Sequence, residues 1–168
     1  MISRKRFNPS VDGLESRLAL SHASGSAVIA SILAAQSHPI RLSGTIHGTA
    51  TRQVLNPDVG ALFHITASGR LAGLGNVTAS GEANGTGFIS QGRSTGSLTI
   101  TNSKGSFTLM LEGPIQPGFT GLPSSYQFTI SGGTGAYVGA TGMGTAHLKV
   151  GPASSTGVSS ITINFHRA

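Results

Sequence analysis

The stretch Phe128-Thr-Ile-Ser-Gly-Gly-Thr-Gly-Ala-Tyr-Val-Gly-Ala-Thr-Gly-Met-Gly-Thr-Ala-His-Leu-Lys-Val150 joins two alternating segments through a glycine-dense turn. Because glycine adopts backbone angles closed to other residues, Gly132, Gly133 and Gly135 predict a sharp structural turn that ends in Tyr137. A phosphate-binding loop would need a helix N-terminus behind the glycines. The residues after Tyr137 have strand composition instead, so we interpret the turn as structural and expect no cofactor.

Alternation with period two continues through the chain from about residue 40, as in strands that bury one face. Asn102-Ser-Lys-Gly105 lies between two such segments and is typical of a hairpin turn. A third expected strand starts at Leu71, with Gly73 and Gly75 marking bulges or tight curvature. The expected strands fall in residues 40–50, 61–67, 71–82, 97–101, 106–112, 126–130, 142–150 and 161–165.

Eight short antiparallel strands with one apolar face each can hide their edges by closing into a barrel. Periodicity alone also permits a two-sheet sandwich. The segment Phe128–Gly144, with Gly-Gly-Thr-Gly-x-Tyr followed by Gly-Ala-x-Gly, resembles the signature of the allene oxide cyclase and dirigent β-barrel families. This resemblance favours an all-β fold, an eight-stranded antiparallel closed β-barrel, and implies possible assembly into homo-oligomers.

Charge and cysteine content exclude several functions. The formal net charge of +6 is partly concentrated in the first 17 residues, and the rest is scattered one residue at a time. Nucleic-acid binding usually needs a concentrated basic footprint, so no nucleic-acid partner is expected. The chain has no cysteine, which excludes disulfides, thiolate metal sites and a cysteine nucleophile.

The N-terminal region does not share the β pattern, and we predict a separate, largely irregular or helical targeting segment at residues 1–38 before a barrel domain at 39–168. Its residues 7–21 resemble a motif found near the N-terminus of exported proteins in planctomycete-type bacteria, Phe-x-Pro-x-Val-x-x-Leu-Glu-x-Arg followed by a small apolar group and Ser. The apolar run Ala27–Ala35 is too short to span a bilayer, which takes about 20 residues. Together they favour export to the periplasm, cell envelope or exterior without an integral membrane span; a segment packed on the domain is the alternative.

Histidines and carboxylates offer no obvious catalytic or metal constellation. Each domain histidine falls on the polar side of its expected strand, and no His-x-His spacing occurs, so no metal site is expected. A paired-carboxylate mechanism would need two of the three domain acids to meet in space. These residues are His47, His64, His147, His166, Asp58, Glu82 and Glu112.

Gly92-Arg-Ser-Thr-Gly96 matches the Gly-x-Ser-x-Gly pattern of a nucleophile elbow. That elbow needs a helix after the serine. Strand composition follows here, so Ser94 is predicted to lie in an ordinary glycine-flanked turn. The ring of Tyr137 is expected to pack over the glycine turn with its hydroxyl at the rim.

Two functional hypotheses remain. The first is an exported or envelope-associated, non-enzymatic barrel that acts through its surface or holds a small hydrophobic ligand. The second is a cyclase-like or dirigent-like enzyme that acts on a hydrophobic substrate inside the barrel, as the family resemblance implies. The polar side chains that point into the barrel, and the space around them, distinguish the two.

Overall fold

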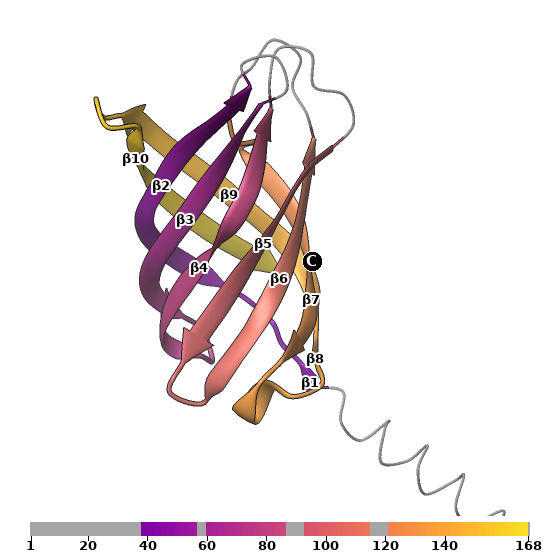
Figure 1. Ribbon diagram of the computed structural model, residues 1–168. Helices are drawn as coiled ribbons and strands as arrows, with labels where there is room; N and C mark the ends of the chain where they lie inside the picture. The colour runs from indigo at the N-terminus through magenta and orange to yellow at the C-terminus, as the bar shows by residue number, and fades with distance from the viewer. Residues whose placement is uncertain (1–37, 57–59, 87–92, 115–120, 168) are drawn as a thin grey trace, which may run out of the picture. The chain divides into compact units, whose positions relative to one another are not determined.

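The computed structural model describes residues 38–56, 60–86, 93–114 and 121–167, and these form a strand-built unit (Figure 1). Alternation of Val, Ile, Phe and Ala with Thr, Ser and other polar residues suits a pleated surface with one buried face. Eight strands of 9 to 13 residues result. They are β2 (Gly44–Asn56), β3 (Gly60–Leu71), β4 (Gly75–Thr86), β5 (Arg93–Asn102), β6 (Gly105–Pro114), β7 (Ser125–Gly133), β9 (Met143–Ala153) and β10 (Val158–Arg167).

These eight strands close into a barrel in the order β10-β2-β3-β4-β5-β6-β7-β9, with every neighbouring pair antiparallel. The predicted eight-stranded antiparallel closed β-barrel is therefore confirmed. Closure depends on the pairing of β10 with β2, in which Ile163 lies opposite Ile46. Because the first and last long strands are hydrogen-bonded, the sheet has no free edge.

Two tight turns set the register of the β3–β4 and β5–β6 hairpins. The third barrel strand begins at Gly75 and not at Leu71 as predicted, because Gly73 and Gly75 both have φ of 76° and form the turn after β3. The predicted Asn102–Gly105 hairpin is present, with Asn102 paired to Gly105. There the Lys104 amide donates to the Asn102 side-chain oxygen at 2.9 Å, an Asx-type contact.

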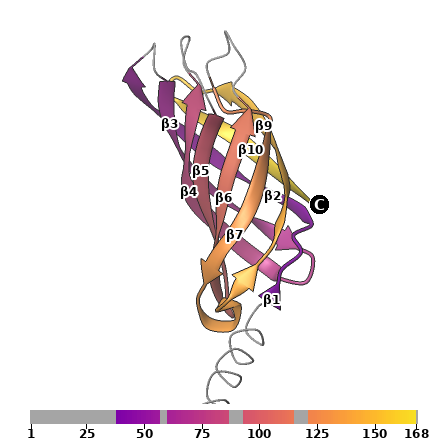
Figure 2. The ribbon, with the colours of Figure 1, turned by 90° about the vertical axis from the view of Figure 1, so that its right-hand side faces the viewer.

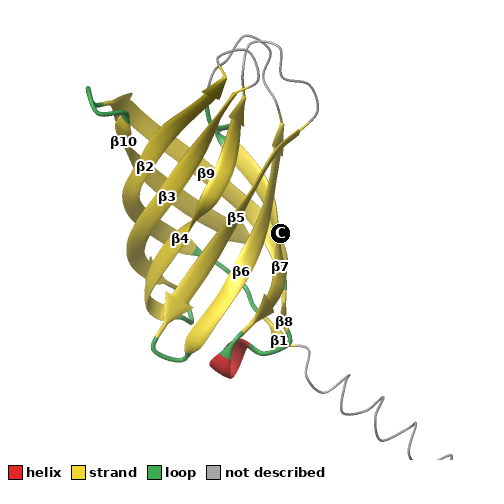
Figure 3. Ribbon diagram, viewed as in Figure 1, coloured by secondary structure: helices red, strands yellow, loops and turns green. Residues whose placement is uncertain are grey.

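Sequence periodicity did not predict a small second sheet near one end of the barrel. Strand β1 (His38–Pro39) runs parallel to β8 (Ala140–Thr141), beside the short helix η1 (Gly135–Tyr137) (Figures 2 and 3). Apart from His38, the predicted targeting segment at residues 1–38 lies outside the described residues. No helix in the described ranges is long and apolar enough to cross a membrane.

Residues after β1 cross this end of the barrel. The Ile40 amide donates to the Thr141 carbonyl at 2.8 Å, and the Ala72 amide in the β3–β4 turn donates to the Ser43 carbonyl at 2.9 Å. Between these two anchors Leu42 is buried among the core residues, with 1% of its surface exposed. The segment closes the end of the barrel with an apolar side chain.

Candidate functional site

The barrel interior is filled with apolar side chains. Inward side chains on different strands are almost fully buried: Ile46, Leu98, Leu109 and Ile163 each expose 2% of their surface or less. The rings of Phe128 on β7 and Phe165 on β10 meet edge to face at 5.9 Å over β9, the strand between them, in a favourable aromatic geometry. A ligand-sized cavity beside the four aliphatic side chains would leave part of their surface accessible to solvent, and almost none is accessible.

Among the described residues, three side chains with hydroxyl groups are buried inside the barrel between β strands: Ser94 and Tyr126, which form a pair, and Ser159 on β10. Ser94 is buried on β5, and its hydroxyl contacts the Tyr126 hydroxyl at 2.8 Å and the Asn84 carbonyl. The serine proton goes to the carbonyl, so the Tyr126 hydroxyl donates to Ser94 Oγ. Burial, only partly offset by the hydrogen bond to Ser94, raises the pKa of Tyr126 to about 12. The phenol is neutral and satisfied, and it braces β5 against β7.

This placement corrects the prediction for Ser94. The residue lies within β5 and faces the interior, whereas the glycine-flanked pattern had predicted a turn. Gly96 lies in β5, where the backbone approaches β4 so closely that a Cβ would lie 2.5 Å from the Glu82 carbonyl oxygen. Glycine is therefore needed for close strand pairing there, and it does not mark a turn. Ser94 has no histidine partner among its described contacts, so the arrangement is not that of an activated nucleophile.

The glycine-dense segment forms the corner between β7 and β8. Gly132 and Gly135 have φ of 80° and 59°, values that favour glycine, and Gly133 lies close to the Tyr137 carbonyl. The buried Tyr137 ring meets Phe107 edge to face at 5.1 Å. Its hydroxyl accepts a 2.6 Å hydrogen bond from the Asn102 amide, which also donates to the Leu74 carbonyl. The corner thereby holds the β5–β6 hairpin in place.

All four predicted histidines lie exposed on the outer face, on the polar side of their strands. His47 contacts Thr162 at 3.1 Å and His64 contacts Glu82 at 3.0 Å. The rings of His147 and His166 meet at 5.2 Å across β9 and β10. In the described ranges no group of three or more His, Cys, Asp or Glu side chains could hold a metal ion.

The carboxylates also lie on the outer face, and the two described ones have different partners. Glu112 pairs with Arg93 at 2.8 Å, whereas Glu82 pairs with His64. Both Glu side chains are about half exposed, so these contacts add little to stability. Asp58 lies outside the described residues.

Many outer hydroxyl and amide groups have cross-strand partners on the barrel itself. Thr49 bonds to Thr66 at 3.1 Å, and Thr99 to Thr108 at 3.2 Å. Thr45 donates to Asn164, so pairing of this kind also spans the closure between β2 and β10. A polar group that already has a partner in the protein has fewer free donors and acceptors for a ligand.

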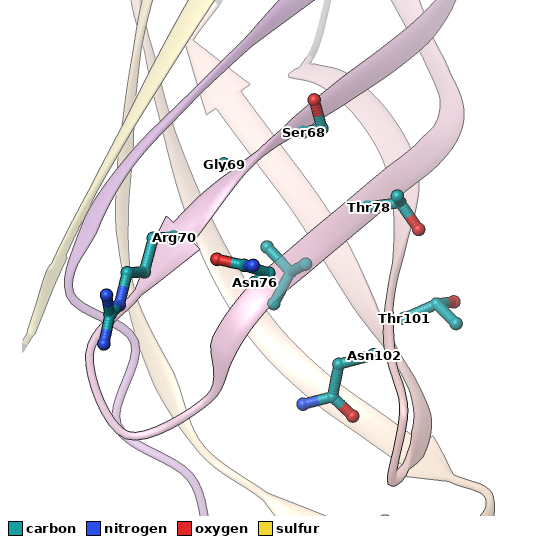
Figure 4. Close-up of a pocket in the computed structure, with 8 residues that line it drawn as sticks. Ser68, Gly69, Arg70, Asn76, Thr78, Thr101 and Asn102 are labelled. Atoms are coloured by element: carbon teal, nitrogen blue, oxygen red, sulfur yellow. The ribbon is translucent and has the colours of Figure 1, made fainter.

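A pocket of about 710 Å³ on β3, β4 and β5 differs from this pattern (Figure 4). Its volume falls within the range of about 300–1,000 Å³ usual for small-molecule sites. Outward side chains from three strands meet there because the register places Ser68 opposite Thr78, Thr78 opposite Thr101, and Arg70 opposite Asn76. The lining consists of Ser68, Gly69, Arg70, Asn76, Val77, Thr78, Thr101 and Asn102.

Most polar side chains of this pocket are unpaired. Ser68, Arg70, Asn76, Thr78 and Thr101 form no side-chain hydrogen bond or ion pair with other described residues. Asn102 is the exception, since it is held by Tyr137, Leu74 and Lys104. The pocket therefore combines one fixed amide with five polar side chains whose hydrogen-bonding capacity is open to a ligand.

The sequence interpretation did not single out this group. The tight turn after Leu71 could have indicated part of it, because a hairpin places residues equally distant from its turn opposite each other. The resemblance to the cyclase and dirigent families stays an interpretation of the glycine corner. No protein-family model matches the chain, and no curated protein or solved structure is significantly similar to it.

Proposed function

We propose that this protein is an exported or envelope-associated, non-enzymatic β-barrel that binds a ligand on its outer face. The carrying observation is the contrast between the filled interior and the outer pocket on β3–β5 with its unpaired polar side chains. The pocket is a shallow, open depression, and it brings together polar groups from three strands, as ligand sites do.

The enzymatic alternative needs polar groups that converge on an open interior. The interior pair Ser94–Tyr126 is bonded to itself and to a backbone carbonyl, and the surrounding side chains are apolar and buried. A small hydrophobic ligand would meet the same obstacle inside the barrel. This favours binding on the outer face over catalysis or storage within.

Heteronuclear NMR of the ¹⁵N-labelled full chain tests where binding occurs. We expect saccharide probes such as maltotriose and trigalacturonate to shift the amides of Ser68–Arg70, Asn76–Thr78 and Thr101–Asn102, and the hydrophobic dye anilinonaphthalene sulfonate to leave interior amides unchanged. Shifts of Leu98, Leu109 and Ile163 amides on addition of the dye would overturn the proposal and restore an interior site.

Export is tested separately by expressing the gene in its native host, fractionating the cells and sequencing the N-terminus of the protein. We expect it in the envelope or medium. Recovery in the cytosol with Met1 intact would refute export while leaving the binding site untouched.

A further inference from the structure

We infer that the outer pocket on β3–β5 recognises a saccharide that carries a carboxylate, with Arg70 as the residue that selects the charge. This inference rests on the proposed binding function and names its ligand class. It begins from the chemistry of the lining: one guanidinium, two carboxamides and three hydroxyls. No carboxylate of the described chain lines the pocket, so nothing on its wall competes for the guanidinium.

The spacing of these groups suits a ligand with many hydroxyls. Ser68, Thr78 and Thr101 form a row across three adjacent strands, which lie about 4.8 Å apart. Arg70 and Asn76 form a second row two residues further along, about 6.8 Å away. Hydroxyl and amide groups both donate and accept, as sugar hydroxyls do, so the grid matches a ligand that needs both from one surface.

Arg70 is the one cation of the pocket lining and can pair with one negative charge on a ligand. Figure 4 shows Arg70 and Asn76 on neighbouring strands at one side of the pocket, apart from the hydroxyl row. The planar guanidinium binds a carboxylate through two parallel hydrogen bonds, which a neutral sugar cannot provide. A phosphate carries more charge and is usually held by several cations or by a row of backbone amides, and Arg70 is the only charged residue of this lining.

Asn102 forms a fixed edge of the pocket, because its side-chain amide is already hydrogen-bonded within the protein. Its amide nitrogen donates to Tyr137 and to the Leu74 carbonyl, and its side-chain oxygen accepts from the Lys104 amide. The glycine corner therefore supports the edge of the pocket through the Tyr137 hydroxyl. A rigid edge lowers the ordering cost of binding.

The test compares two ligands of one shape on the full-length protein by titration calorimetry: trigalacturonate and its neutral methyl ester. We expect the acidic trimer to bind at least tenfold more tightly. Arg70→Gln should reduce its affinity to that of the ester and leave the ester unchanged, and Arg70→Lys should give an intermediate affinity because the charge remains without the planar fork.

Arg93→Gln is the matched control, since Arg93 is also an exposed arginine on the outer face but pairs with Glu112 and does not line the pocket. It should change neither affinity. Equal affinities for the two trimers, an unchanged Arg70→Gln variant, or an equal loss in Arg93→Gln would overturn the inference while leaving outer-face binding intact. Failure of the wild-type protein to bind either trimer would refute both this inference and saccharide binding at the pocket.

A second arm identifies the source of the carboxylate. If the pocket binds an envelope or matrix polysaccharide, long polygalacturonate should bind more tightly than the trimer. If the pocket binds free oligosaccharides, the affinity per polymer chain should equal that of the trimer. Either result supports the inference if Arg70→Gln weakens the binding of polygalacturonate, and unchanged binding by this variant would contradict it.

Discussion

Substitution of Gly48 by alanine tests the close approach of β2 and β3. Gly48 lies opposite Ala67, and a Cβ built on it would lie 1.9 Å from the Thr66 carbonyl oxygen and 2.5 Å from the Ala67 Cα. Ordinary carbon contacts begin near 3.5 Å, so the added methyl is too close by about 1.5 Å. The obstructing atoms are backbone atoms of a hydrogen-bonded ladder, which can move only if the strands separate.

Overpacking usually costs about 1–3 kcal/mol and occasionally more. We place Gly48→Ala at about 3 kcal/mol or above, because no side-chain rotation relieves the contact. With a urea m-value of about 1–3 kcal/mol/M, the unfolding midpoint should fall by about 1–3 M. Equilibrium urea unfolding followed by far-UV circular dichroism measures the change.

Gly151→Ala is the matched control on another strand of the same barrel. The nearest atom to its added Cβ is the Ser160 Oγ at 2.3 Å, a hydroxyl at the end of a short side chain that can rotate away. This variant should lose less than about 1 kcal/mol. If the two variants lose the same stability within about 0.5 kcal/mol, the close backbone approach at Gly48 is not the cause of a large stability loss.

Three further predictions concern polar groups within the fold. The raised pKa of Tyr126 means that the unfolded chain ionises at about pH 10 while the folded chain stays neutral to about pH 12, so stability should fall by up to about 2.7 kcal/mol as pH rises through this window. Urea titrations at pH 8, 10 and 11.5 measure this loss, and Tyr126→Phe should remove the part due to this residue; an identical pH slope in the variant would contradict the assignment. Ser94→Ala leaves the buried Tyr126 hydroxyl without its acceptor and should cost about 1–3 kcal/mol in the same assay; a neutral result would mean that the hydroxyl has found another partner. Tyr137→Phe removes the hydrogen bond from Asn102, which keeps the Leu74 carbonyl, and should cost about 1 kcal/mol; unchanged thermal unfolding would show that the corner does not depend on that bond.

Local patterns predicted the strands well because burial alternates residue by residue within each of them. Phe63 and Ile65 are buried while His64 between them is exposed, as the period-two pattern indicated. The hairpin at Asn102–Gly105 was also predictable, since both its residue types and its hydrogen bonds are local. The prediction for Gly73 was wrong because a glycine inside an alternating segment can mark a bulge or a turn, and both can have a positive φ.

The candidate site could not be predicted because it depends on register between strands. Ser68, Thr78 and Thr101 are unremarkable polar residues in sequence, and they form a row only when three strands are aligned. Ser94 was misplaced for a related reason. Its inward orientation follows from the alignment of β5 with β4 and β6, whereas its flanking glycines resemble those of a turn.

The hydrogen-bonded pairing of β10 with β2 has a consequence for how the chain matures. Contacts between residues so far apart in sequence form slowly, because the entropy of closing the intervening loop must be overcome first. Barrel closure cannot finish until the ten residues of β10 have been synthesised. A nascent chain therefore keeps an open sheet until β10 has been made, even when the other seven barrel strands have already paired.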